Sequence, residues 1–190
     1  MCTWPGDDAL MIAYHDNEWG RPLHDDRALF EYMVLDAFQA GLSWRTVLHK
    51  REAFRKAFAG FDPKKVQRFT QEDIERLMQD AGIIRNRAKI TATIHNARCF
   101  LEVQRSFGSF DKYIWQFCGG KPIVHHHEAN SSVPARSEES DAMSKDLISR
   151  GFKFVGSTIC YAFMQAAGMI NDHLISCPCH KRVQQKSAHR

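Results

Sequence analysis

Apolar side chains recur along this chain every three to four positions, and this helical spacing constrains its fold more than any other sequence feature. Between a capping aspartate, Asp25 or Asp26, and Ala40, they stand at Leu29, Phe30, Met33, Val34, Ala37 and Phe38. Gly41 is placed to end this helix. Because no segment alternates apolar and polar residues over any length, we predict an all-α architecture.

The same reasoning predicts several further helices. Ser43 is expected to cap a helix over 44–58, Asp62-Pro63 begins a short helix, and Thr70 and Asp73 form a capping pair for a helix over 71–82. Four more helices are expected at about 84–107, 113–117, 139–150 and 157–168. The two helices within 71–107 form a helical hairpin. Residues 119–140 are rich in Gly, Pro, Ser and His and are expected to form a loop.

The length of 190 residues and a hydrophobic content of 44% fit one helical unit over 1–180, followed by a basic, disordered tail over 181–190. No run of about 18 apolar residues suggests a membrane span, and no basic and apolar leader opens the chain. Six cysteines without an export signal fit a reducing compartment. We expect a cytoplasmic protein that acts as a monomer, away from membranes.

Charge is distributed unevenly along the chain, although the net charge of +4 is small. The segment 85–98 holds four basic residues and no acid, and 45–56 holds five basic residues against Glu52 alone. Such stripes could meet nucleic-acid phosphates or merely solvate helix faces, and charge alone leaves both possibilities open.

The turn of the hairpin, Asp80 to Arg87, places Gly82 between two helices, with basic residues just after it. Glycine permits close approach of a ligand to the backbone, and the free amides that begin the second helix attract anions. This combination suits a DNA phosphate. A plain helix connector would show the same pattern.

Cysteine and histidine residues at both ends of the chain are candidate metal ligands. His173 and Cys177 lie one helical turn apart, and Cys2 and His15 could complete a tetrahedral zinc site. Cys179 and His180 compete as ligands. The three consecutive histidines, His125 to His127, are interpreted as loop polarity because neighbouring residues do not converge easily.

Asp36 is a carboxylate within an apolar helical run, and a buried charge usually has a partner or a function. Four aromatic residues, Tyr14, Trp44, Trp4 and Trp19, could join it in a pocket for a flat, positively charged ring. By itself, the pattern favours the simpler interpretation, in which the aromatic residues belong to the core and Asp36 faces solvent.

Several segments read together resemble one family. They are 12–20 (IAYHDNEWG), 39–44 (QAGLSW), 80–85 (DAGIIR) and 151–161 (GFKFVGSTICY) leading to 171–173 (NDH). The chain is similar over 2–179 to the 3-methyladenine DNA glycosylase I family of bacterial alkylation-repair enzymes. This resemblance implies a helix-hairpin-helix glycosylase fold with a structural zinc that joins the two chain ends.

The resemblance also implies residue roles. The zinc ligands correspond to Cys2, His15, His173 and Cys177, and the base pocket to Tyr14 and Trp44, which stack on the base, with Asp36 as the catalytic carboxylate. Leu42, beside Gly41, lies where family members enter the DNA stack. The family usually carries glutamate where this chain has Asp36, which puts its catalytic strength and base preference in doubt.

We therefore expect an enzyme that flips 3-methyladenine out of alkylated double-stranded DNA and hydrolyses its bond to the sugar. Amides of Gly82 and Ile83, with Arg85, Arg87 and Lys89, would hold phosphates. No lysine stands out as a Schiff-base nucleophile, so the product would be an abasic site, without lyase cleavage. The alternatives are a non-catalytic zinc-containing DNA-binding module and a glycosylase with altered base preference.

Overall fold

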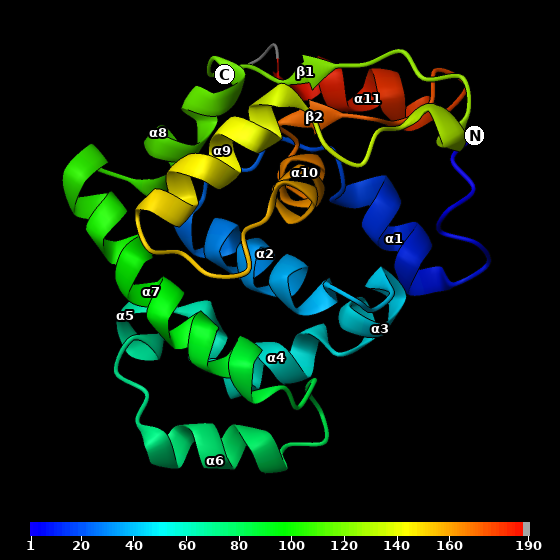
Figure 1. Cartoon of the computed structure of the whole chain (residues 1–190). Coiled ribbons are helices and arrows are strands. Elements are labelled where there is room, and N and C mark those ends of the chain that lie inside the picture. The colour runs from blue at the N-terminus through cyan, green and yellow to red at the C-terminus, as the bar shows by residue number, and fades with distance from the viewer. Residues whose placement is uncertain (188–190) are drawn as a thin grey trace.

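A computed structural model describes residues 1–187, and side chains through Gln185. Helices make up most of it, as predicted (Figure 1). The α-helices are α1 (Ala9–Asn17), α2 (Asp26–Gln39), α3 (Trp44–His49), α4 (Arg51–Ala57), α5 (Pro63–Val66), α6 (Gln71–Gln79), α7 (Arg87–Phe107), α8 (Phe110–Ile114), α9 (Glu138–Ser149), α10 (Ser157–Ala166) and α11 (Pro178–Ser187). Short 3-10 helices cover η1 (Ala59–Phe61), η2 (Trp115–Cys118) and η3 (Asn130–Ser132).

Two strands of two residues each, β1 (Ile123–Val124) and β2 (Ile170–Asn171), pair in parallel. Ile123 lies opposite Ile170, and Val124 lies opposite Asn171. The pair is too short to change the fold class, but it joins the predicted 119–140 loop to the chain just before the C-terminal segment. Within residues 1–187, no helix is both long enough and apolar enough to cross a membrane.

Helix α2 lies at the centre of the molecule, with α7 and α10 packed beside it (Figure 1). It is buried on every side from Leu29 to Phe38, which is why its sequence is apolar over more than one face. Aromatic contacts join it to its neighbours: the ring centroids of Phe30 and Phe100 are 5.1 Å apart, and those of Phe38 and Phe54 are 4.7 Å apart. The core therefore fixes the side of α2 that carries Asp36.

The predicted starts of four helices are confirmed. Side chains of Asp25, Ser43 and Asp62 accept backbone N–H groups at the starts of α2, α3 and α5, and Thr70 forms the capping box of α6 with Asp73. The single helix predicted over 44–58 is instead two helices, α3 and α4. They meet at Lys50, whose N–H bonds the carbonyl of Val47 three residues back and so tightens the last turn of α3.

Two terminal features were not expected from the sequence. Helix α1 begins at the cap Asp8, which accepts the N–H groups of Leu10 and Met11. The predicted tail over 181–190 is helical as far as Ser187, within α11, and residues 188–190 lie outside the described residues. The α-amino group of Met1 donates to Ser176 Oγ at 2.7 Å, so the first residue contacts the segment before α11.

Candidate functional site

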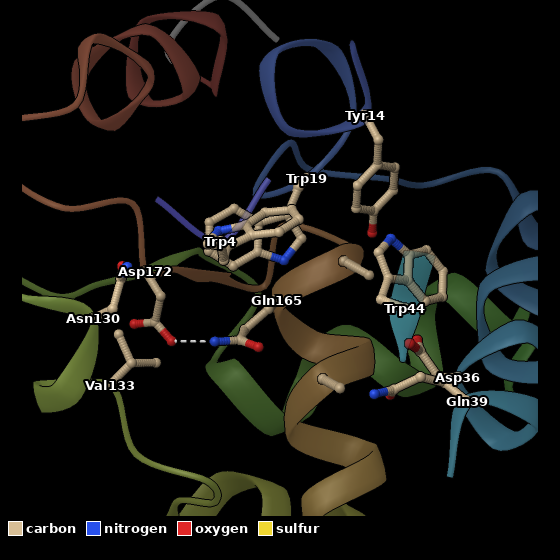
Figure 2. A pocket seen from close by; sticks show the side chains of 12 residues that line it. Trp4, Tyr14, Trp19, Asp36, Gln39, Trp44, Asn130, Val133, Gln165 and Asp172 are labelled. Atoms are coloured by element: carbon tan, nitrogen blue, oxygen red, sulfur yellow. Dashed lines mark hydrogen bonds between the residues drawn. The ribbon is translucent and has the colours of Figure 1, made fainter. Parts of the chain in front are cut away.

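A cavity of about 380 Å³ opens between α1, α2, α3, α10 and the segment around η3 (Figure 2). Its lining includes four aromatic residues and one carboxylate that the sequence singled out: Trp4, Tyr14, Trp19, Trp44 and Asp36. The structure therefore brings together residues that lie up to 40 positions apart in the sequence. A concave, largely apolar site with a few polar groups is the usual form of a small-molecule pocket.

Asp36 projects from α2 into this cavity (Figure 2). The residue is 3% exposed, so it is not a carboxylate facing bulk solvent. Its Oδ2 atom is buried and has no hydrogen-bond partner within the described residues. Burial raises the pKa of Asp36 well above its usual range because the charged form loses its hydration. A buried carboxyl without a partner is poised to receive a ligand.

Tyr14 and Trp44 form one wall of the cavity. Their ring centroids are 5.1 Å apart and their planes are tilted by 46°. A base between two parallel rings needs them about 7 Å apart, twice the ordinary contact distance. The two rings therefore leave no space for a base between them, and a flat ligand has access to one side of this wall.

Trp4 and Trp19 extend the aromatic lining, with ring centroids 5.2 Å apart. The indole N–H groups of Trp4 and Trp44 are buried and lack an acceptor in the part of the chain that the structure describes. A buried donor without a partner costs about 1–3 kcal/mol. The site therefore holds unpartnered donors and an unpartnered carboxyl, all in or beside one cavity.

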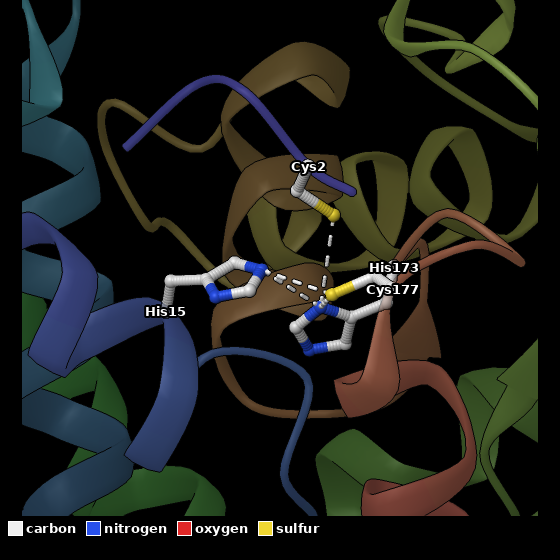
Figure 3. Close-up of side chains that lie close together, drawn as sticks. All are labelled: Cys2, His15, His173 and Cys177. Atoms are coloured by element: carbon white, nitrogen blue, oxygen red, sulfur yellow. Dashed lines mark hydrogen bonds between the residues drawn. The ribbon is translucent and has the colours of Figure 1, made fainter. Parts of the chain in front are cut away.

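Cys2, His15, His173 and Cys177 converge at the joined chain ends, as the sequence predicted (Figure 3). All four are buried, and their ligand atoms lie within 4.8 Å of one another. His173 Nδ1 is 3.1 Å from His15 Nε2, and Cys177 Sγ is 3.7 Å from His15 Nε2. In tetrahedral zinc sites, two nitrogen ligands lie about 3.3 Å apart and a nitrogen and a sulfur about 3.6 Å apart. This group could hold a metal ion.

The surroundings of this cluster orient its ligand atoms. His15 Nδ1 lies 2.7 Å from Asp16 Oδ1, and His173 Nε2 lies 3.1 Å from the carbonyl of Trp19, so each ring turns its other nitrogen inward. Burial lowers the pKa of His173 to about 4, which keeps the imidazole in its neutral, ligating form. Because Trp19 lines the cavity, the cluster also supports the pocket wall.

The two competing candidates have other contacts. Cys179 Sγ donates to Asp16 Oδ1 at 3.6 Å, and His180 Nε2 lies 2.8 Å from the carbonyl of His125. Cys179 also forms a second candidate group with His15 and Asp16, but among the described residues only the set that the resemblance implied brings together four ligand residues that are all buried.

The turn after α2 exposes Leu42 beside the cavity residue Gln39. Leu42 is 42% exposed, and Gly41 has a φ of +80°, a conformation that favours glycine. The N–H of Leu42 donates to the carbonyl of Gln39 at 2.7 Å. A large apolar side chain thus stands at a tight turn on the surface.

The hairpin between α6 and α7 contains an exposed Arg85 and amides of Ile84 and Arg85 that have no acceptor within residues 1–187. The N–H of Gly82 is already bonded to Asp80 Oδ1 at 2.8 Å. A Cβ on Gly82 would come within 2.9 Å of Ala53 Cβ, so glycine lets the turn pack against α4. Ile83 is buried beneath the turn, and its N–H donates to the carbonyl of Asp80 at 3.3 Å. The amides of Gly82 and Ile83, which we expected to hold phosphates, are therefore already bonded within the turn.

The basic residues around the hairpin differ in availability. Arg87 forms two hydrogen bonds with Glu75, at 2.7 and 2.8 Å, and remains about half exposed. In the stripe 45–56, Arg51 and Arg55 pair with the buried Glu31. Some of the basic residues in each predicted stripe therefore already form ion pairs with acidic residues of the same protein.

Lys89 requires a correction, because we expected it to contact phosphate. It is buried, and its ammonium group donates to the carbonyls of Phe38 and Ala40 at 2.9 and 2.7 Å. These carbonyls end α2, where a cation is stabilising. Lys89 thus ties α7 to the turn that carries Leu42.

Sequence reasoning missed the side of the cavity formed by α10 and the 119–140 segment. Its lining there includes Gln165, Asp172, Asn130 and Val133 (Figure 2). It also misread two of the three histidines, since His125 and His127 both contact Asp172. Their spacing of two residues was the available signal, because alternate residues of an extended segment point to the same side.

Comparisons with known proteins agree on one family. Residues 4–180 match the family model described as methyladenine glycosylase. The chain is 52% identical over 179 residues to DNA-3-methyladenine glycosylase 1 of Escherichia coli, covering 94% of this chain and 96% of that protein. A crystal structure of 3-methyladenine DNA glycosylase I superposes with a TM-score of 0.92 at 50% identity, covering 94% of this chain and 98% of the other.

A third similar protein is the 3-methyladenine DNA glycosylase I of Staphylococcus aureus, whose structure is described as showing the basis of 3-methyladenine recognition. It is 39% identical, has a TM-score of 0.91, and the alignment covers 93% of this chain and 94% of that one.

Proposed function

Since the chain belongs to the methyladenine glycosylase family, we propose that it removes 3-methyladenine from alkylated duplex DNA and leaves an abasic site. The observation that carries this proposal is the cavity, in which a buried, unpartnered carboxyl faces an aromatic wall. The bacterial relatives fit action on the chromosome, in the cytoplasm. We propose that the protein acts there as a monomer.

The cavity suits a flat cation. A base methylated at N3 is positively charged while it is attached to the sugar, and it would stack on the wall of Tyr14 and Trp44, with Trp4 and Trp19 completing the enclosure. Asp36 would accept a hydrogen bond from the exocyclic amine of the base. A cationic base hydrogen-bonded to Asp36 would favour the ionised carboxylate and so oppose the effect of burial, which raises the pKa of Asp36.

Hydrolysis needs little help beyond this binding. The base departs as a neutral molecule because cleavage of the glycosidic bond returns the bonding electrons to a cationic ring, so protonation by a strong acid is unnecessary. Asp36 would hold the cationic base in the cavity, and its negative charge would stabilise the positive charge that develops on the sugar as the base leaves and water attacks. Among the side chains through Gln185 that the structure describes, none that lines the cavity is a lysine, which supports a monofunctional enzyme without a Schiff base.

Leu42 and the hairpin would deliver the base to this cavity. Leu42 would enter the stack at the vacated position, supported by the Gly41 turn and by the tie from Lys89. The α6–α7 pair would act as a helix-hairpin-helix element, in which the free amides of the turn and the side chains of Arg85 and Arg87 hold phosphates. Gly82 and Ile83 would shape that turn.

The Cys2, His15, His173 and Cys177 group would hold a structural zinc ion. Two thiolates and two imidazoles form a closed tetrahedral set, without an open position for chemistry. The ion would supply no step of the reaction. It would join residue 2 to the segment before α11 and hold Trp4 and Trp19 in place.

Release of free base from methylated duplex DNA, analysed by mass spectrometry, tests the proposed function. We expect 3-methyladenine to be released, with strand breaks appearing only after alkaline treatment. DNA binding without release above the buffer rate would instead support the non-catalytic module.

The presence of Asp36 specifically favours a second candidate, a glycosylase with altered base preference. Aspartate is one methylene shorter than glutamate, so it leaves more room beside the bound base. The same assay, extended to every base released, would identify this outcome by a product other than 3-methyladenine as the main one.

A further inference from the structure

The short parallel strand pair sets two histidines beside a buried aspartate. Val124 of β1 lies opposite Asn171 of β2, so the next residues, His125 and Asp172, come directly after paired positions. The N–H of His125 donates to the carbonyl of Asn171 at 3.2 Å and continues the pairing by one residue. His127 follows two positions later and points to the same side.

The three side chains converge on one carboxylate oxygen. His125 Nδ1 lies 2.6 Å from Asp172 Oδ1, and His127 Nε2 lies 3.1 Å from the same atom. The Asp172 side chain is fully buried, whereas those of His125 and His127 are 32% and 15% exposed. The group is thus anchored inside the protein and accessible from outside through one histidine.

The other hydrogen bonds of the group favour one position for the proton of His127. Asp172 Oδ2 accepts from the Tyr161 hydroxyl and from Gln165 Nε2, each at 2.7 Å, which leaves Oδ1 for the histidines. Ser132 Oγ donates to the carbonyl of Ala129 at 2.6 Å, so it can accept from His127 Nδ1 at 3.3 Å.

A histidine with its proton on Nδ1 presents a lone pair on Nε2. In this tautomer the lone pair of His127 faces a carboxylate oxygen, and two acceptors in contact need a positive centre between them, which is either a proton on Nε2 or a metal ion. A metal ion supplies one, and the Ser132 contact is the kind of outer-shell hydrogen bond that fixes the tautomer of a ligating histidine.

We propose that His125, His127 and Asp172 bind a divalent transition-metal ion such as Zn²⁺, at a site separate from the Cys2, His15, His173 and Cys177 group. Two imidazole nitrogens and one carboxylate oxygen suit zinc, cobalt and nickel. Ligand atoms about 3.3 Å apart would surround such an ion, so the His125–Asp172 contact opens by less than about 1 Å on binding. The exposure of His125 permits this movement.

The ion would stabilise the rim of the cavity. Asp172 lines the cavity, and so do Asn130 and Val133, which follow the two histidines in the chain. Joining the histidine segment to Asp172 therefore fixes two neighbouring parts of the cavity lining (Figure 2). It also holds Asp172 Oδ2 in position for Gln165, another lining residue.

Cobalt titration tests this second site, because thiolate-bound Co²⁺ has a charge-transfer absorption band that a site of two histidines and one aspartate lacks. The proteins to compare are the full chain, the double variant His125→Gln with His127→Gln, and the matched control His126→Gln, whose side chain is exposed and outside the cluster. We expect the full chain and the control to bind one more equivalent than the double variant, without added charge-transfer absorption.

Equal stoichiometry in all three proteins would overturn the proposal, as would an extra equivalent that carries the thiolate band. If the double variant does not fold, His127→Gln alone serves as the second variant. Loss of one ligand should weaken the second binding event at least tenfold, and unchanged affinity in a folded variant would again contradict the proposal.

Discussion

The Asp36 side chain combines two properties that oppose each other. Its burial disfavours the charged form, yet the proposed chemistry uses that form opposite a cation. Folding therefore supplies a carboxyl that is unfavourable for stability and available for a ligand. Gln39, one turn later on α2, and Trp44 lie beside it without bonding it.

Asp36→Asn should increase stability in a manner that depends on pH. Because the folded pKa of Asp36 is raised, the folded state binds more protons than the unfolded state between the unfolded pKa, about 3.9, and the folded one. The Asp36 contribution to stability therefore falls as pH rises through this window. Melting temperatures of both proteins from pH 4 to 8 should diverge with rising pH, with the variant higher; a constant difference would contradict the raised pKa.

At the scale of elements, one side chain couples the hairpin helix α7 to the end of α2. The ammonium group of Lys89 bonds two carbonyls there, and its pKa is lowered by burial. Lys50 makes a similar link, donating to the carbonyls of Ala81 and Gly82 in the hairpin turn. Lys89 thus joins the hairpin helix to the turn that carries Leu42, and Lys50 joins the hairpin turn to the junction of α3 and α4.

Lys89→Met should destabilise the protein by about 2 kcal/mol, since it leaves the carbonyls of Phe38 and Ala40 without a charged donor. It should not change the salt dependence of DNA binding, because Lys89 contacts no phosphate. Arg85→Met, at an exposed position, is the control that should lower the slope of log K against log salt by about 0.9. A smaller salt dependence for Lys89→Met as well would indicate that Lys89 contacts a DNA phosphate.

Leu42→Ala tests whether the Leu42 side chain fills the position that the flipped base leaves in the DNA stack. The side chain is exposed, so the melting temperature should change little, whereas excision from duplex DNA should fall about tenfold because the extrahelical base loses its replacement in the stack. Excision from single-stranded methylated DNA is the control and should be unaffected. An equal loss on both substrates would argue against insertion of Leu42 into the stack.

Sequence reasoning located most elements because their ends carry local signals. Asp25, Ser43, Asp62 and Thr70 are caps whose hydrogen bonds form within three residues, so a short window of sequence contains them. The strand pair at Ile123 depends on its pairing with Ile170, in a distant part of the chain. Periodicity does not encode such contacts.

At the scale of the whole molecule, the chain ends and the cavity form one unit. The carbonyl of Trp19 lies beside His173 Nε2, and Trp4 lies 5.5 Å from His15 between ring centroids. The site that could hold zinc is therefore in contact with two residues that line the cavity. Removal of the ion should disturb both stability and base binding.

Cys2→Ser should lose about one equivalent of metal and about 2 kcal/mol or more of stability, which corresponds to a fall in melting temperature of roughly 4–8 °C. Cys118→Ser is the control, because Cys118 lies outside the cluster and its thiol donates to the carbonyl of Trp115. Metal content by elemental analysis and thermal melting are the two measurements. Unchanged metal content in Cys2→Ser would remove Cys2 from the ligand set.

The candidate site was less predictable than the fold. The resemblance identified Asp36, Tyr14 and Trp44, and the structure gathers them in one cavity. The tilt between the two rings, the burial of Lys89 and the contacts of Asp172 arise from side-chain packing between elements far apart in the sequence. No spacing rule contains those angles and distances.

The rate of 3-methyladenine release from methylated duplex DNA, under single-turnover conditions, tests the central claim that Asp36 acts on a cationic base in this cavity. Asp36→Asn should lower the rate about 100-fold or more, with metal content unchanged and folding intact. Asp36→Glu, which keeps the charge, should retain activity. Undiminished release by Asp36→Asn would contradict the account.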